Sequence, residues 1–217
     1  MATPAADVRS FYDLGHQGDV DRTQLARALA LTPDQRLRRH EGWRPLLKGA
    51  AVEPTFIADT VNRLCDAGVE FVIAGGVSAV LHGSPVITND LDLCYRRTPD
   101  NVRRLVAALA PLNPRPRGFP PDLPFAFDER TVLLGSNFTL AVGPEDLDLL
   151  GTMSAVGGYE QVIGAAADMT VAGRPVKVLA LTDLIASKEA AGRPKDVAVL
   201  PLLRALLAAR AGGGPPV

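Results

Sequence analysis

The sequence contains little of what marks a disulfide-stabilised, zinc-binding or membrane-spanning protein. Among its 217 residues are only two cysteines, Cys65 and Cys94. They form no CxxC pattern and no Cys/His spacing, which argues against a disulfide framework and a zinc site. No apolar run approaches the roughly 18 to 20 residues that cross a bilayer, and the first residues lack the charged-then-apolar order of a signal peptide. We therefore expect a soluble, cytoplasmic protein with no membrane partner.

The chain also lacks an excess of charge of either sign. Lys and Arg number 23 and Asp and Glu number 24, which gives a formal net charge of -1. A dedicated nucleic-acid-binding protein carries a basic footprint, so any such binding here must use a local patch. The length allows one main domain with an appendage, because domains cluster near roughly 100 to 150 residues. We expect residues 1–50 to form a partly helical N-terminal extension, residues 51–210 the main domain, and residues 211–217 a disordered tail.

A basic helix is the main feature of the N-terminal extension. Thr32 followed by Pro33 is typical of a helix start. The residues that make this helix basic are Arg36, Arg38, Arg39, His40 and Arg44. Such a face is either solvated or binds an acidic partner, and the solvated face is the more frequent of the two.

From Pro54 onward, helical and extended patterns alternate along the chain. Helices are predicted over residues 55–68, 77–83, 99–112, 157–166, 181–192 and 194–210. Strands are predicted over residues 69–76 and 90–96 and, as several short pieces, over 131–151 and 169–181. A proline-rich connection lies between residues 113 and 124. Strands separated by helical segments predict an α/β or α+β domain, with helices packed on a mixed β-sheet.

A glycine pair introduces the clearest chemical signal of the sequence. Gly75 and Gly76 follow a predicted strand and open a predicted helix. Bare backbone N–H groups at the start of a helix can face a phosphate at close range, and the hydroxyl of Ser78 is a candidate further donor. This turn is therefore a candidate anion-binding site.

Two acidic strands provide candidate metal ligands. Asp90 and Asp92 lie two residues apart on one strand, so both side chains leave the same face and can hold a hard cation through oxygen. Asp148, between Leu147 and Leu149, is the corresponding residue of a second acidic strand. A divalent cation would relieve the repulsion among these carboxylates. Each motif alone is common, but their conjunction predicts a site for Mg²⁺, with Mn²⁺ as the alternative ion.

The segment GGVSAVLHGSPVITNDLDLCYRRTPDN resembles the signature of the DNA polymerase beta-like nucleotidyltransferase superfamily. It is most similar to minimal members related to abortive-infection and type IV toxin nucleotidyltransferases. The resemblance extends over residues 54–205. It implies a mixed-sheet nucleotidyltransferase fold, a nucleoside triphosphate (NTP) and Mg²⁺ as cosubstrates, and transfer of a nucleoside monophosphate to a hydroxyl acceptor. A toxin-like setting would add a cognate antitoxin as a partner.

The same resemblance assigns roles to residues. Gly75, Gly76 and Ser78 correspond to the triphosphate-binding turn, and Asp90, Asp92 and Asp148 to the catalytic metal-binding acids. The later segment LTDLIASKEAAGRPKD resembles a helical element with a functional lysine, whose matching positions are Lys188, Lys195 and Asp196. There Lys188 would neutralise phosphate charge, and Asp196 would orient a lysine or the acceptor. An ordinary helix start with a solvated lysine accounts equally well for this second segment.

One departure from the family pattern keeps other functions open. Many relatives carry a basic residue between the helix-ending glycine and the acidic pair, whereas residues 84–89 contain none. The arginines available to replace it are Arg96, Arg97, Arg115 and Arg117. The first alternative is a non-catalytic module that binds a nucleotide or a protein, and the second is an antibiotic-modifying nucleotidyltransferase. For an active enzyme, the acceptor stays open among tRNA or other RNA, a protein and a small molecule.

Overall fold

The structure, a computed structural model, describes residues 20–48, 55–120 and 122–211. The expected domain boundary at residue 50 and all but the first residue of the expected tail lie outside these residues. Within the described part of the chain, no helix is both long and apolar enough to cross a membrane.

Helices and strands alternate along most of the chain. The helices are α2 (Arg22–Leu29), α3 (Pro33–Lys48), α4 (Phe56–Asp66), α5 (Gly75–His82), α6 (Pro99–Leu109), α7 (Glu129–Leu134), α8 (Tyr159–Val162), α9 (Leu181–Ala191) and α10 (Pro194–Ala211). The strands are β1 (Phe71–Ile73), β2 (Asp90–Tyr95), β3 (Arg115–Pro116), β4 (Asn137–Val142), β5 (Glu145–Leu150), β6 (Ala167–Val171) and β7 (Arg174–Val178).

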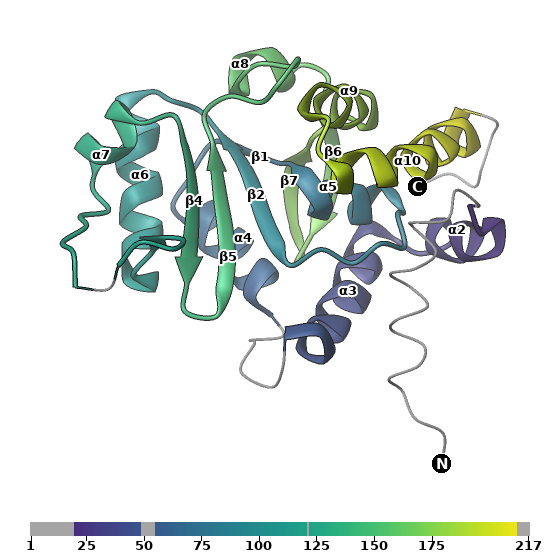
Figure 1. Cartoon of the computed structure of the whole chain (residues 1–217), viewed down its shortest axis with the longest axis horizontal. Coiled ribbons are helices and arrows are strands. Elements are labelled where there is room, and N and C mark those ends of the chain that lie inside the picture. The colour runs from purple at the N-terminus through teal and green to yellow at the C-terminus, as the bar shows by residue number, and fades with distance from the viewer. Residues whose placement is uncertain (1–19, 49–54, 121, 212–217) are drawn as a thin grey trace.

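The described strands form one seven-stranded sheet in the order β3-β4-β5-β2-β1-β7-β6. The pairs β2–β5 and β1–β7 are parallel, and the other neighbours are antiparallel. Helices pack on both faces of this sheet (Figure 1). The arrangement confirms the predicted fold class of a mixed β-sheet with packed helices.

Each face of the sheet has its own hydrophobic core. In the view of Figure 1, α4 and α6 lie behind the sheet, and their apolar residues form one core together with alternate leucines of the acidic strands. These strand leucines are Leu91, Leu93, Leu147 and Leu149. On the other face, α9, α10 and Ala79 of α5 form the second core against Val72 of β1 and Leu179, which follows β7. Because side chains alternate along a strand, the aspartates between those leucines leave the sheet on this second face.

Local capping explains where several helices begin and end. At the start of α3, the backbone N–H of Gln35 donates to the Thr32 hydroxyl at 3.2 Å, and the Gln35 side chain accepts from the Thr32 N–H at 2.9 Å. This reciprocal pair satisfies two N–H groups that the helix leaves free. At the end of α5, Gly83 adopts a left-handed conformation with φ of 112°, which closes the helix.

Part of the predicted strand region over residues 131–151 is wrong. Residues 131–134 belong to α7, because Asp128 caps that helix by accepting from the Thr131 N–H at 2.7 Å. The rest of the region forms the hairpin of β4 and β5, as predicted. Two short elements were not predicted: α2 in the N-terminal extension and β3 in the proline-rich connection.

The expectation of a solvated basic face on α3 is also wrong in its main residues. Arg36, His40 and Arg44 are buried, with exposed fractions of 5%, 4% and 0%. Arg36 donates to the backbone carbonyls of Ala28 and Leu81, at 2.9 and 2.5 Å. These residues recur at every fourth position, so they lie on one face of the helix. That face packs against the rest of the same chain. Only Arg38 and Arg39 of the basic set are exposed.

Candidate metal and nucleotide site

Three carboxylates meet on the second face of the sheet. In the parallel pairing of β2 with β5, Asp90 lies opposite Asp146 and Asp92 opposite Asp148. Asp90, Asp92 and Asp148 each offer a carboxylate oxygen, and these oxygens all lie within 4.8 Å of one another. We call these three residues the acidic cluster. The two acidic motifs, far apart in the sequence, are therefore brought together by strand pairing.

The acidic cluster carries unfavourable electrostatics. Burial raises the pKa of Asp92 to about 7, and repulsion from Asp90 and Asp148 adds to this rise. Attraction to Lys188 and a hydrogen bond from the Gly76 backbone N–H oppose it. Burial likewise raises the pKa of Asp148 above its usual range. Among the described residues, no arginine or lysine lies within ion-pair distance of Asp90 or Asp92. A cation among the three would remove this penalty.

The glycine pair at the start of α5 packs directly against the site. A Cβ atom on Gly75 would stand 1.8 Å from Oδ2 of Asp92, and one on Gly76 would stand 2.4 Å from Oγ1 of Thr88. Gly75 also has a φ of 55°, in the left-handed region that favours glycine. The Thr88 hydroxyl in turn donates to Oδ1 of Asp90 at 2.6 Å. The glycines thus allow the helix start to approach both metal-binding candidates of β2.

Ser78 lies next to this turn without facing the cluster. Its side chain is buried, and its hydroxyl donates to the Gly75 carbonyl at 2.8 Å. The hydroxyl therefore stabilises the first turn of α5. The assignment of Ser78 to the triphosphate-binding turn stays a prediction, and the observed contact of its hydroxyl is within that turn.

Lys188, in the last turn of α9, acts electrostatically on the acidic cluster. Lys188 donates to Oδ1 of Asp196 at 2.8 Å, and its charge acts on Asp92. Arg193, which sequence reasoning left out of the site, donates from Nε to Oδ2 of the same Asp196 at 2.5 Å. Burial of Asp196 opposes its ionisation, but these two hydrogen bonds outweigh that effect and lower its pKa. Asp196 therefore binds the charged groups of Lys188 and Arg193 beside the acidic cluster.

The other lysine of this element, Lys195, lies on the protein surface. Lys195 is exposed, and no hydrogen bond or ion pair joins it to another described residue. Of the two lysines matched by the family resemblance, Lys188 acts on Asp92 of the acidic cluster, and nucleotide binding by Lys195 stays a prediction.

Among the four arginines considered as substitutes for the missing basic residue, only Arg117 contacts a member of the acidic cluster. It forms an ion pair with Asp148, and its Nη1 lies 3.8 Å from Oδ1 of Asp146. Arg97 donates to the carbonyls of Leu133 and Gly135 instead. Arg96 pairs with Glu70 and Glu160, and Arg115 donates to the carbonyls of Pro120 and Leu123. Arg117 therefore neutralises the outer side of the cluster.

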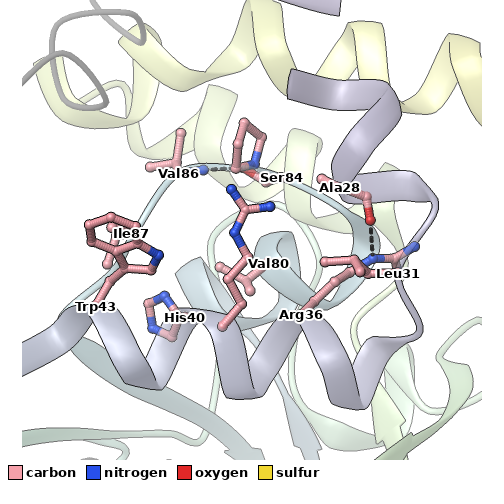
Figure 2. Close-up of a pocket in the computed structure, with 11 residues that line it drawn as sticks. Ala28, Leu31, Arg36, His40, Trp43, Val80, Ser84, Val86 and Ile87 are labelled. Carbon is pink, nitrogen blue, oxygen red and sulfur yellow. Dashed lines mark hydrogen bonds between the residues drawn. The ribbon is translucent and has the colours of Figure 1, made fainter. Parts of the chain in front are cut away.

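A separate pocket lies behind the segment that leads to Asp90. Residues of α3, α5 and the 84–87 segment line it, and Figure 2 shows His40 and Trp43 of α3 beside Val86 and Ile87 of that segment. Burial lowers the pKa of His40 to about 4, the charge of Arg44 adds to this, and an interaction with the Thr88 backbone opposes it. This pocket contains none of the carboxylates of the acidic cluster.

Comparison with known proteins adds a distant likeness. No protein-family model and no curated protein matches the chain. Among solved structures, the chain is similar to the solution structure of the antibiotic-resistance factor ANT(2'')-Ia, with a TM-score of 0.43 and 18% sequence identity. The match covers 73% of this chain and 92% of that chain. A likeness at this level does not decide a function, which has to be argued from the site.

Proposed function

We propose that the protein is a Mg²⁺-dependent nucleotidyltransferase that transfers a nucleoside monophosphate from an NTP to a hydroxyl acceptor. The observation that carries this proposal is the convergence of Asp90, Asp92 and Asp148 within 4.8 Å, beside the glycine-opened start of α5. A lysine next to the cluster supplies the positive charge that a triphosphate requires.

The acidic cluster fits a hard divalent cation. All three donors are carboxylate oxygens, the ligands that Mg²⁺ and Mn²⁺ prefer. Burial raises the pKa of Asp92, repulsion from Asp90 and Asp148 adds to this rise, and a bound cation would lower that pKa. When bound, Mg²⁺ would neutralise triphosphate charge and increase the acidity of the attacking hydroxyl.

The residues around the cluster have distinct proposed roles. Lys188, held by Asp196, would bind phosphate oxygens on the α9 side of the site. The α5 start at Gly75 and Gly76 would place backbone N–H groups near the same phosphates. Ser78 would stabilise this turn through its bond to the Gly75 carbonyl.

The proposed reaction is an in-line displacement at the α-phosphorus. The acceptor oxygen forms a bond to the α-phosphorus, the bond to the bridging oxygen breaks, and pyrophosphate leaves. The acceptor hydroxyl loses one proton, which Asp148 would take, because burial raises the pKa of this carboxylate above its usual range. The products are the nucleotidylated acceptor and pyrophosphate.

The proposal specifies the acceptor only as a molecule that carries a hydroxyl group. Any hydroxyl on a tRNA or other RNA, a protein or a small molecule satisfies the reaction, and an antitoxin partner would be expected in a toxin-like setting. The non-catalytic alternative requires that the cluster stay neutralised without a metal. Arg117 neutralises Asp148 alone among the three, which favours the catalytic hypothesis.

The test is incubation with α-³²P-labelled NTPs, Mg²⁺ and a cell extract. We expect labelled product with the wild type and a loss of at least about 100-fold with Asp92→Asn, since the variant removes one metal ligand. Asp168→Asn is the matched control, because Asp168 is 81% exposed and pairs with Lys177 away from the site. Equal labelling by wild type and Asp92→Asn would contradict the proposal. Nucleotide binding in calorimetry that needs neither Mg²⁺ nor Asp90 would favour the non-catalytic module.

A further inference from the structure

Arg44, which belongs to α3 in the N-terminal extension, contacts both strands of the acidic cluster. It forms an ion pair with Glu145, the first residue of β5. It also donates from Nη2 to the carbonyl of Asn89 at 3.3 Å, and Asn89 immediately precedes the first residue of β2. One guanidinium group therefore joins the beginnings of the two parallel strands.

This ion pair is fully removed from solvent. The side chains of Arg44 and Glu145 are 1% and 2% exposed, and the guanidinium lies 5.6 Å from the centre of the Phe56 ring. A buried ion pair gives little net stability compared with apolar residues of similar size, because both charges must be desolvated. In some proteins such a pair is retained because it fixes the geometry of the groups that it joins. The groups joined here lie at the beginnings of β2 and β5.

That geometry controls the metal-binding candidates. Residue pairing begins at Asp90 opposite Asp146, one residue beyond the two contacts of Arg44, and continues to Asp92 opposite Asp148. Repulsion among the carboxylates acts to separate the strands at this end. A shift of one residue would also turn each side chain to the opposite face of the sheet. The Arg44 contacts oppose both changes.

We infer that Arg44 is a positioning residue, which holds β2 and β5 together so that their aspartates can share one cation. The inference rests on the proposed function, since it concerns the metal site of that function. It also gives α3 a role in the chemistry of the main domain, although α3 contributes no group to the acidic cluster itself.

The experiment measures Mn²⁺ binding directly by electron paramagnetic resonance, without substrate. Arg44→Met should weaken Mn²⁺ binding about tenfold, the lower end of the range for residues that support metal ligands. The matched control is Arg36→Met. Arg36 is a buried arginine of the same helix, but it donates to carbonyls of α2 and α5 and not to either acidic strand. We expect Arg36→Met to lower the melting temperature and to change Mn²⁺ affinity less than twofold.

A double variant separates positioning from stability. Arg44→Met removes one member of the Arg44–Glu145 ion pair, whereas Arg44→Met with Glu145→Met replaces both members by apolar groups. The double variant should recover the melting temperature but not the Mn²⁺ affinity, because the bond to Asn89 stays lost. It also keeps the test valid if Arg44→Met does not fold.

Two results would overturn the inference. One is wild-type Mn²⁺ affinity in a folded Arg44→Met or double variant, and the other is an equal loss of affinity in Arg36→Met. If the wild type itself binds no Mn²⁺, the proposed function fails, and the inference fails with it. A wild type that binds Mn²⁺ while Arg44 variants do so equally well refutes the inference alone.

Discussion

At the scale of single residues, the start of α5 packs against the carboxylate of Asp92 through Gly75. Gly75 was expected to bring backbone N–H groups close to a phosphate. Its tightest neighbour is instead the Asp92 carboxylate, at 1.8 Å from an added Cβ. Sequence spacing shows that a glycine is required, but it does not show which partner approaches it, because that partner lies on another strand. The same limit applies to Ser78, whose hydroxyl bonds its own helix.

Substitution of Gly75 by alanine tests this close approach. The added methyl group would displace Asp92, so we expect Gly75→Ala to lower nucleotidyl transfer on the order of 100-fold, as misplacement of about 1 Å can do. The conformational strain at φ of 55° should also cost about 1 kcal/mol of unfolding free energy. Activity is measured with labelled NTP, and stability by urea denaturation.

Gly173→Ala is the control for that strain. Gly173 has a φ of 77° in the turn between β6 and β7, and an added Cβ there would meet no atom within 4 Å. The control should lose about 1 kcal/mol of stability and retain its activity. If both variants kept wild-type activity, the contact between Gly75 and Asp92 would not contribute to nucleotidyl transfer.

At the scale of elements, periodicity located most helices and strands, and capping residues decided the exceptions. The segment Thr131–Leu134 has the apolar, β-branched composition of a strand, yet it is helical because Asp128 caps it. The burial of α3 was missed for a different reason. Its arginines indicate solvent exposure in the sequence, and the partner of Arg44 is Glu145, 101 positions away. The signal that was available is the recurrence of Arg36, His40 and Arg44 at every fourth residue.

The junction of α9 and α10 makes a prediction that separates its two lysines. Lys188 is held by Asp196 and acts electrostatically on Asp92, whereas Lys195 is exposed. We expect Lys188→Met to lower kcat/KM for the NTP by at least about 100-fold, the loss typical of a positioned group that stabilises developing charge. Lys195→Met should change it less than twofold. Equal effects of the two substitutions would remove Lys188 from the proposed phosphate site.

At the scale of the whole molecule, a buried histidine joins α5 to α10. His82 at the end of α5 interacts through Nε2 with the Leu179 carbonyl at 2.8 Å, and through Nδ1 with Arg210 of α10. Nδ1 can accept from an arginine only if the ring is neutral. Burial lowers the pKa of His82 to about 4, and the charges of Arg210 and Arg36 add to this effect, while the Leu179 bond opposes it.

This low pKa sets the direction of a pH effect on stability. Between about pH 6.5 and pH 4, the unfolded chain binds a proton at His82 that the folded protein does not bind, so acid favours unfolding. The contribution of His82 is fully present above about pH 6.5 and is lost as the pH falls. Glu41 behaves in the opposite way, because burial raises its pKa to about 7, so its contribution is lost as the pH rises from about 4.5 to 7.

A pair of variants with opposite expected slopes tests this assignment. The wild type should exceed His82→Gln in unfolding free energy at pH 7.5, and this difference should shrink by about 2 kcal/mol at pH 5, since 1.5 pH units below the unfolded pKa each cost about 1.4 kcal/mol. For Glu41→Gln, the difference from the wild type should shrink as the pH rises instead. Urea denaturation at five pH values measures both. Parallel stability curves for wild type and His82→Gln would show that His82 keeps an ordinary pKa in the folded protein, and the proposed neutral link between α5 and α10 would then be wrong.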